Sequence, residues 1–203
     1  MKIITKTKMQ AILAVKTTDN SERRSWMKGF TLLKDKIIAT DSKMLLVTNY
    51  DDYDTENYPD VIDQTDTKDF DNDVVLYTFL DKLIKNTTKS ICNIIDNTAA
   101  IIKTKKDDIL GVCTDLENTV KIKTSQLDSD TPDYQTVIDS CENTDSIKVT
   151  NNFNIKQLEK ALKVLRLTGA ENVSITSYEN RNIPTKMETH LNDELYLMQV
   201  LKK

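Results

Sequence analysis

Apolar and polar residues follow their most regular pattern between positions 146 and 169, where they predict a strand followed by a capped helix. Ile147 and Val149 alternate with polar neighbours, which is the period of a half-buried strand. Asn154 occupies the N-cap position of the predicted helix, and Gln157 three residues later can complete a capping box with it. This stretch therefore carries both a strand signal and a helix-start signal.

The helix behind this cap is expected to begin near Ile155 and to end at Gly169, because glycine readily takes the left-handed conformation of helix ends. One stripe of the helix is apolar and is expected to face a core: Ile155, Leu158, Ala161, Leu162 and Leu165. The opposite stripe is basic: Lys156, Lys160 and Lys163. Such a stripe faces either water or a negatively charged partner.

The same order of strand, cap and helix occurs twice more. Residues 73–86 predict a strand at 74–77, a cap at Thr78 and a helix with Phe79, Leu80, Leu83 and Ile84 inward and Lys82 and Lys85 outward. In residues 1–16, a strand is predicted at Ile3 and Ile4, and a capping box at Thr7 and Gln10. The helix behind it would have an apolar face made of Met9, Ile12 and Leu13. The three units begin near positions 2, 74 and 147, which are 72 and 73 positions apart, so the pattern indicates an internal repeat.

Each helix is followed by a run of short strands rather than by a single strand. The expected strands span 30–33, 36–40, 44–48, 91–95, 99–104, 109–114, 120–124, 172–177, 183–187 and 195–201. Runs of strands between helices favour an α+β fold of repeated β-α-β-meander units, with antiparallel sheets and the helices on one side. We expect a two-unit domain at 1–140, with units 1–73 and 74–140, and a third unit at 141–203.

Composition narrows the possible partners and the cellular compartment of the protein. The 203 residues are 38% hydrophobic and carry a net charge of −4, so binding to nucleic acid would need a locally concentrated basic surface. A polar segment with Arg23, Arg24 and Trp26 could touch a nucleic acid, or Trp26 could pack on the rim of the core. No apolar run is long enough to span a membrane, and no signal peptide is recognisable. Three widely spaced cysteines fit reduced thiols in a cytoplasmic protein.

The sequence argues against an enzyme or a metalloprotein. His190 is the only histidine, which disfavours metal sites and catalytic triads built on histidine. The three glycines are isolated from one another and cannot form a phosphate-binding loop. The acidic stretch at 51–73 lacks the glycine and the regular spacing of a calcium loop, so a solvated loop is the simpler interpretation. No cofactor and no metal are expected.

Four segments resemble the bacterial DNA polymerase III beta sliding clamp family. ATDSKMLLV at 39–47 resembles a strand-turn-strand segment of that family, and PDYQTVI at 132–138 resembles its interdomain Pro-Asp-Tyr segment. Phe153 and Asn154 before the last helix are similar to a Phe-Asn helix opening, and LYLMQVLKK at 195–203 is similar to the C-terminal strand. Ser42, Met44 and Gln199 depart from the family pattern, which has glycine, arginine and proline there.

The resemblance implies a sliding clamp, a processivity factor whose ring of β-α-β units encircles duplex DNA and tethers a DNA polymerase or other replication proteins. The residues that would face DNA are Lys82, Lys85, Lys156, Lys160, Lys163, Arg166, Arg23 and Arg24. A partner-peptide pocket would involve Met198, Val200 and Leu201, which serve equally well as core. Three units per chain would require a homo-oligomer of four chains for a twelve-unit ring. The alternative is a phage or plasmid clamp-like module that binds a replication protein without encircling DNA.

Overall fold

The computed structural model describes residues 1–16, 25–52, 67–90, 92, 95–129, 133–142, 153–178, 180 and 182–198, with the side chains of Ser25 and Trp26 excepted. Several sequence predictions lie outside these residues: Arg23, Arg24, the strand at 147–149, most of the acidic stretch, Val200, Leu201 and the packing of Trp26.

The described residues form four α-helices, a short 3-10 helix and twelve strands. The helices are α1 (Lys6–Val15), α2 (Tyr77–Asn86), α3 (Tyr134–Glu142) and α4 (Ile155–Leu167), with the 3-10 helix at Ser25–Lys28. The strands are β1 (Lys2–Thr5), β2 (Gly29–Leu32), β3 (Lys36–Thr40), β4 (Met44–Asn49), β5 (Thr67–Lys68), β6 (Asp73–Leu76), β7 (Thr98–Thr104), β8 (Ile109–Thr114), β9 (Thr119–Thr124), β10 (Val173–Thr176), β11 (Thr185–Thr189) and β12 (Glu194–Leu197). The predicted α+β class is confirmed.

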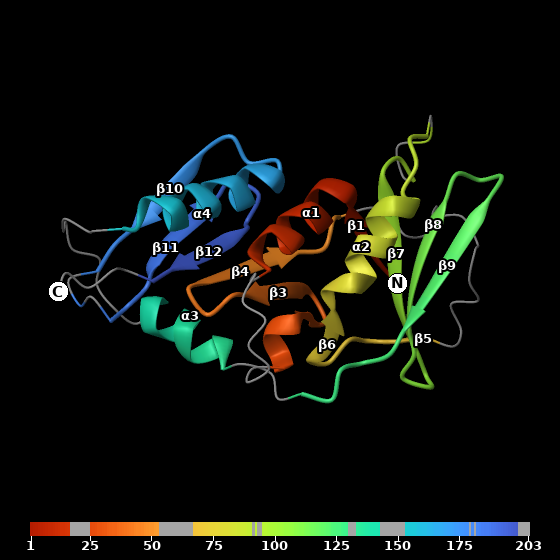
Figure 1. Cartoon of the computed structure of the whole chain (residues 1–203), viewed down its shortest axis with the longest axis horizontal. Coiled ribbons are helices and arrows are strands. Elements are labelled where there is room, and N and C mark those ends of the chain that lie inside the picture. The colour runs from red at the N-terminus through yellow and green to blue at the C-terminus, as the bar shows by residue number, and fades with distance from the viewer. Residues whose placement is uncertain are drawn as a thin grey trace.

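Two antiparallel sheets are built by exchange of strands between the units (Figure 1). One sheet has the order β1-β7-β8-β9, with β5 beside β7, and the other has the order β10-β11-β12-β4-β3-β2-β6. Strand β1 of the first unit pairs with β7 of the second, and β6 of the second unit pairs with β2 of the first. The third unit joins the first through the pairing of β12 with β4. The division into domains at 1–140 and 141–203 stays a prediction.

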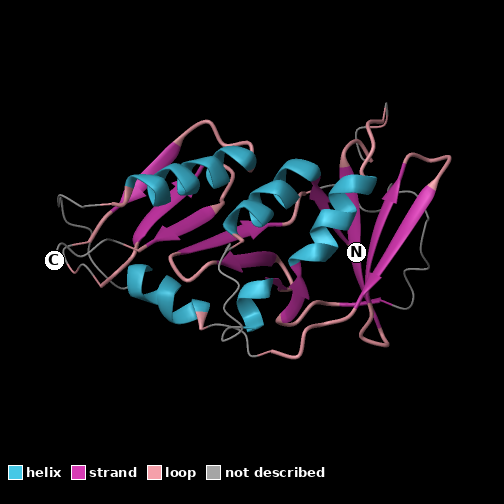
Figure 2. Ribbon diagram, in the orientation of Figure 1, coloured by secondary structure: helices cyan, strands magenta, loops and turns pink. Residues whose placement is uncertain are grey.

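Helices α1, α2 and α4 lie on one side of the sheets, and α3 lies on the opposite side of the seven-stranded sheet (Figure 2). The main core under the three helices contains Met9, Leu80, Leu83 and Val164 together with inward side chains of both sheets. A second core lies under α3, where Ile138 and Cys141 pack on the reverse face. The central strands are therefore buried on both faces, which explains their continuous apolar runs.

Gly111 marks a place where α2 approaches the sheet too closely for a side chain. A Cβ atom there would lie 2.4 Å from Leu83 Cδ2 and 2.8 Å from Phe79 Cζ, both on the buried face of α2. Real atoms do not approach so closely, so a larger residue would force the Leu83 and Phe79 side chains to shift. The glycine thus leaves room on β8 for the side chains of α2 that pack against it.

The predicted start and end of the last helix are confirmed, but its buried face is rotated. Asn154 accepts hydrogen bonds from the amides of Lys156 at 3.0 Å and Gln157 at 3.4 Å, and Gly169 has φ +95°. The helix buries Ala161, Val164 and Leu165. Ile155 and Leu162, expected in the core, are 74% and 42% exposed.

The predicted starts of the first two helices were wrong. Helix α1 begins at Lys6 and is capped by Thr5, whose hydroxyl accepts from the amide of Lys8 at 3.4 Å, so Thr7 and Gln10 form no capping box. Helix α2 begins at Tyr77, one residue before the predicted cap at Thr78, and its N-cap residue makes no side-chain hydrogen bond. Strong burial of the first turn of α2 takes the place of a side-chain cap.

Two local features between the units differ from the sequence predictions. Helix α3 begins at Tyr134, in a segment where no helix was predicted. Asp133 starts this helix by accepting hydrogen bonds from the amide and the hydroxyl of Thr136 at 3.1 Å and 2.6 Å. Cys92 and Ile95 lie in a bend and a turn instead of the strand predicted at 91–95, while residues 91, 93 and 94 are outside the described part.

A buried ion pair joins the two sheets at the beginning of the second unit. Lys103 Nζ on β7 lies 2.6 Å and 2.8 Å from the two carboxylate oxygens of Asp73 on β6. The Asp73 side chain is fully buried and that of Lys103 is 7% exposed. Removal of Lys103 would leave the fully buried Asp73 carboxylate without its counter-charge, so the pair holds β6 beside the second sheet.

Removing the lysine alone should destabilise the protein strongly. Lys103→Met is expected to lower the free energy of unfolding by about 3–5 kcal/mol, because the Asp73 carboxylate would stay buried without its counter-charge. Urea unfolding followed by circular dichroism measures this. The double variant Asp73→Leu with Lys103→Met is the control and should recover most of the loss. A double variant as unstable as the single one would contradict the explanation.

Candidate partner pocket and basic helix face

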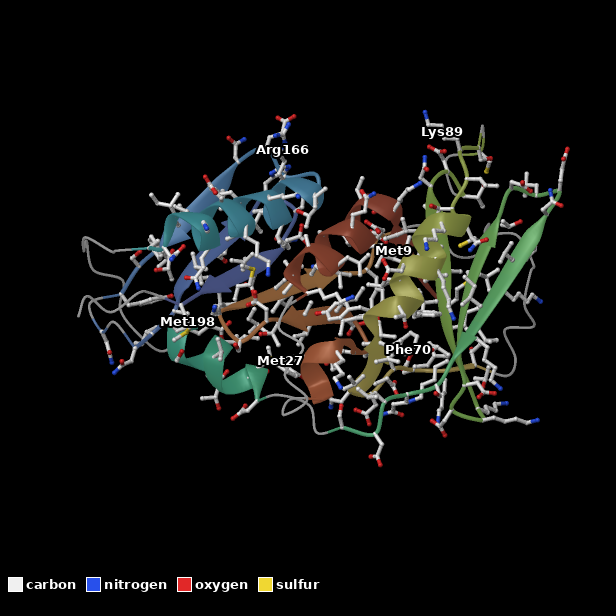
Figure 3. The ribbon with its side chains drawn as sticks, viewed as in Figure 1. Met9, Met27, Phe70, Lys89, Arg166 and Met198 are labelled. Carbon is white, nitrogen blue, oxygen red and sulfur yellow. The ribbon has the colours of Figure 1, made fainter. Side chains whose placement is uncertain are left out.

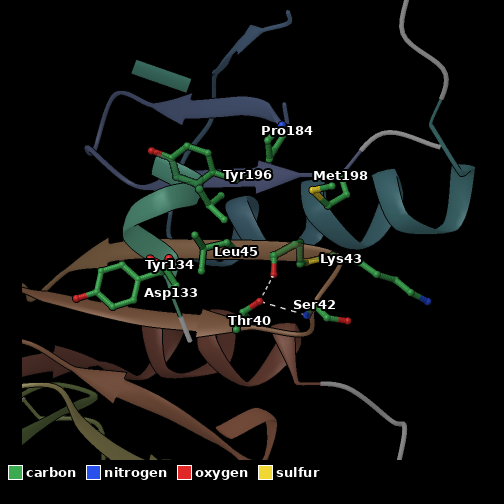
Figure 4. Close-up of a pocket in the computed structure, with 11 residues that line it drawn as sticks. Thr40, Ser42, Lys43, Leu45, Asp133, Tyr134, Pro184, Tyr196 and Met198 are labelled. Atoms are coloured by element: carbon green, nitrogen blue, oxygen red, sulfur yellow. Dashed lines mark hydrogen bonds between the residues drawn. The ribbon is translucent and has the colours of Figure 1, made fainter. Parts of the chain in front are cut away.

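An apolar pocket opens on the α3 side of the seven-stranded sheet, where the first and third units meet (Figure 4). Its volume is about 230 Å³. It is lined by Thr40, Ser42, Lys43, Met44, Leu45, Asp133, Tyr134, Val137, Pro184, Tyr196 and Met198. These residues come from three places: the β3–β4 turn, the start of α3, and the third unit.

Strand pairing brings the walls of the pocket together. Leu45 on β4 is paired with Tyr196 on β12, and the amide of Met198 donates to the carbonyl of Lys43 at 3.0 Å. Tyr196 and Leu45 are almost fully buried and form the floor, whereas Met198 is 40% exposed at the rim. The pocket therefore exists only because the third unit continues the sheet of the first.

Asp41 holds the β3–β4 turn that forms one wall. Its Oδ1 accepts from the amides of Lys43 at 3.0 Å and Met44 at 2.9 Å. Ser42 between them has φ +70°, a conformation that costs free energy for any residue other than glycine. The hydroxyl of Thr40 accepts from the amide of Ser42 and donates to the carbonyl of Met44, which closes the turn.

The polar groups around the pocket are fixed in their charge states. Hydrogen bonds from the hydroxyl and then the amide of Thr136 lower the pKa of Asp133, so this carboxylate is ionised at neutral pH. Burial, followed by the hydrogen bond to Glu194, raises the pKa of Tyr196 far above its ordinary value, so its hydroxyl stays neutral. Burial also raises the pKa of Tyr134. An apolar cavity with Asp133 and Lys43 at its edge suits a large apolar side chain of a ligand.

A basic face lies on the other side of the sheet, on α2 and α4. We define the helix face as the five exposed cations Lys82, Lys85, Lys156, Lys163 and Arg166. Their helices bury the opposite stripes against the common core, so these side chains point away from it. Figure 3 shows Arg166 pointing away from the body of the molecule. Glu159 is also exposed on α4, so the helix face is basic but not purely so.

Lys160 differs from the other predicted DNA-facing lysines. Its Nζ lies 2.6 Å from Asp41 Oδ2 and donates to the carbonyl of Val15 at 2.9 Å, the last residue of α1. The side chain is 31% exposed, and its charge is matched by the 9% exposed Asp41. Lys160 therefore ties α4 to α1 and to the pocket turn, and we leave it out of the helix face.

The described residues give no sign of a metal centre or a membrane span. They contain no group of three or more His, Cys, Asp or Glu side chains placed to hold a metal ion. No described helix is both long and apolar enough to cross a membrane. His190 is exposed on the β11–β12 turn.

The fold is similar to that of bacterial DNA polymerase sliding clamps of known structure. No family model matches the sequence, and no curated protein matches it. Solved structures do match. The Helicobacter pylori beta clamp bound to a DNA ligase peptide is 12% identical with TM-score 0.62, covering 100% of this chain and 65% of that one.

Two further clamps are also similar to this chain. The Bacillus subtilis DNA polymerase sliding clamp is 16% identical with TM-score 0.60, covering 100% of this chain and 64% of that clamp. The Pseudomonas aeruginosa clamp is 13% identical with TM-score 0.60, covering 98% and 66%. The chain spans less than two thirds of the length of these clamps, and at such low identity the likeness shows the fold.

The pocket gathers segments that the sequence analysis had treated separately. The ATDSKMLLV and PDYQTVI segments supported the family resemblance, but only Met198, Val200 and Leu201 were assigned to a pocket. Met198 does line the cavity, while Val200 and Leu201 lie outside the described residues. The sequence patterns did not identify Tyr134, Val137 and Leu45 as pocket residues. All three lie in the ATDSKMLLV and PDYQTVI segments, so the family resemblance of these segments was a signal that could have found them.

The structural role of Lys160 can be measured against its neighbours. Lys160→Met is expected to lower the free energy of unfolding by about 1–3 kcal/mol, because it removes two charge-assisted hydrogen bonds and leaves Asp41 partly unpaired. Lys156→Met and Lys163→Met are the matched controls and should change stability by less than about 0.5 kcal/mol. Chemical unfolding measures all three. Equal stability of the three variants would show that the Lys160 contacts contribute nothing.

Proposed function

We propose that this protein is a non-enzymatic, DNA-clamp-like processivity factor. It binds duplex DNA without sequence preference through the helix face and tethers a DNA polymerase or another replication protein through the pocket. The observation that carries the proposal is that the molecule has two chemically different faces. Five exposed cations lie on the helix side, and an apolar pocket lies on the reverse side of the sheet. The clamp-like fold over the whole chain supports it.

Electrostatics favours this use of the helix face. The chain as a whole carries −4, so it is repelled by DNA unless a local cluster of cations meets the phosphates. Lysine and arginine side chains on helices contact phosphates without reading bases, which gives loose binding that permits sliding. With three units per chain, a closed twelve-unit ring would take four chains.

The pocket suits a short peptide segment of a partner protein. Its apolar floor and exposed Met198 rim offer a place for one or two large side chains, while Lys43 and Asp133 provide polar groups at the edge. The Helicobacter pylori beta clamp, which has the same fold, is solved with a DNA ligase peptide. We infer that replication proteins dock here in the same general way.

A second candidate is a clamp-like module that docks a replication protein without encircling DNA. The acidic net charge of the chain favours it. It uses the same pocket but has no need for the helix face. Charge reversal on that face therefore separates the two functions.

The triple variant Lys156→Glu, Lys163→Glu and Arg166→Glu should weaken binding to duplex DNA at least tenfold, with a salt dependence reduced by about one unit per lost phosphate contact. Fluorescence anisotropy with a labelled duplex at several salt concentrations measures both quantities. Lys36→Glu, Lys106→Glu and Lys121→Glu form the matched control, since these lysines are also exposed but lie outside the helices. Equal losses in the two triple variants would reject a DNA-binding helix face and favour the second candidate.

Peptide docking is tested at the rim of the pocket. Peptides selected by display on the wild-type protein should carry large apolar side chains, and Met198→Asp should weaken their binding at least tenfold because it places a charge in the apolar cavity. Isothermal titration measures the affinities. Leu116→Asp is the control, because this exposed leucine lies on the β8–β9 turn outside the pocket. Undiminished binding to Met198→Asp would rule out this pocket as the docking site.

A further inference from the structure

The two edges of the seven-stranded sheet differ in how they are covered. Strand β6 at one edge has Val75 fully buried, because the second unit packs over it. Strand β10 at the other edge is hydrogen-bonded only to β11 among the described strands, and its Ile175 is 54% exposed. An unpaired edge with exposed apolar side chains is a site for pairing with another chain.

The exposed residue continues a buried row across the sheet. Ile175 is paired with Met187, which is paired with Leu195, which is paired with Leu46. The last three side chains are fully buried in the main core. Because directly paired residues share a face, Ile175 points to the helix side of the sheet. It is the last residue of this row, at an edge of the core that is exposed to solvent.

Helix α4 is also less covered than its two counterparts. The fourth residue of α1 and of α2, Met9 and Leu80, is fully buried, whereas the fourth residue of α4, Leu158, is only partly buried. The first residue of α2, Tyr77, is 1% exposed, but the first residue of α4, Ile155, is 74% exposed. The first two units cover each other, and nothing in the described chain does the same for the third.

A hollow runs along this boundary between α4 and β10. It is lined by Leu162, Leu165 and Arg166 of the helix, by Val173 of the strand, and by the connecting residues 169–172. Leu162 is 42% exposed there. We call the β10 edge together with Ile155, Leu162 and Ile175 the third-unit face.

We propose that the third-unit face binds the same face of a second copy of this chain, so that two third units complete each other. The first two units already display the required relation. Each gives its first strand to the sheet of the other, β1 to β7 and β6 to β2, in matching registers in which the helix N-cap residue pairs with the first residue of the receiving strand. Swapping the two units leaves such a reciprocal exchange unchanged.

Two identical units in that relation are therefore related by a two-fold axis, and the interface is isologous. The repeat itself identifies the occupant, because a unit of this kind is covered by another unit of the same kind. This inference rests on strand topology and burial, and it does not require DNA binding or peptide docking. The strand edge of β9, which is free among the described strands of the other sheet, is a separate surface.

The test uses two variants that block different surfaces. Val120→Asp places a charge on exposed β9, and Leu162→Glu with Ile175→Asp places charges on the third-unit face. Light scattering coupled to size exclusion gives the mass of each variant and of their 1:1 mixture. We expect Val120→Asp to form a two-chain species, the face variant to have a lower mass than the wild type, and the mixture to contain no complex between the two variants.

Other outcomes overturn the proposal. If both variants are monomers and their mixture forms a dimer, the third-unit face pairs head to tail with β9. If Val120→Asp is a monomer both alone and in the mixture, the third-unit face does not self-associate. The same conclusion follows if the face variant keeps the wild-type mass. Leu116→Asp, another exposed leucine, is the control and should keep the wild-type mass. Thermal unfolding confirms that all variants are folded, since every substituted side chain is surface-exposed.

Discussion

Exchange of first strands between units is the constraint on which the rest of the structure depends. Strand β1 completes the sheet of the second unit and β6 completes that of the first, so neither unit can form its sheet alone. The buried pair of Asp73 and Lys103 stands where this exchange takes place, with one residue on β6 and the other on β7. Because a buried charge without its partner is costly, the ion pair also penalises any other placement of β6.

Much of this fold was predictable because local signals and tertiary packing agree. The Asn154 cap, the Gly169 stop and the spacing of the three units are properties of the chain itself, and the strands at 36–40 and 109–114 match β3 and β8. The errors arise where packing overrides local signals. Tyr77 begins α2 without a side-chain cap because burial of its first turn stabilises the helix instead. Ile155 and Leu162 fit an apolar stripe but lie at an open boundary that no sequence pattern marks.

The candidate site was only partly predictable for a related reason. A lysine used within the fold and a lysine that faces water look alike in sequence, and only tertiary contacts separate Lys160 from Lys156 and Lys163. The pocket needs three distant segments, and their meeting is set by the pairing of β12 with β4. Helix α3, which forms one wall, escaped prediction although Asp133 and the spacing of Val137, Ile138 and Cys141 are ordinary helix signals.

The Asp41 carboxylate connects the two faces of the seven-stranded sheet. One of its oxygens fixes the pocket turn on the α3 side, and the other receives Lys160 from α4, the helix that carries Lys156, Lys163 and Arg166. A charge-assisted hydrogen bond of this length leaves little freedom for the turn to move relative to the helix. The Asp41 carboxylate therefore joins the helix that carries the helix face to the turn that forms one wall of the pocket. Because α4 belongs to the third unit and the turn to the first, the same carboxylate also ties these two units together.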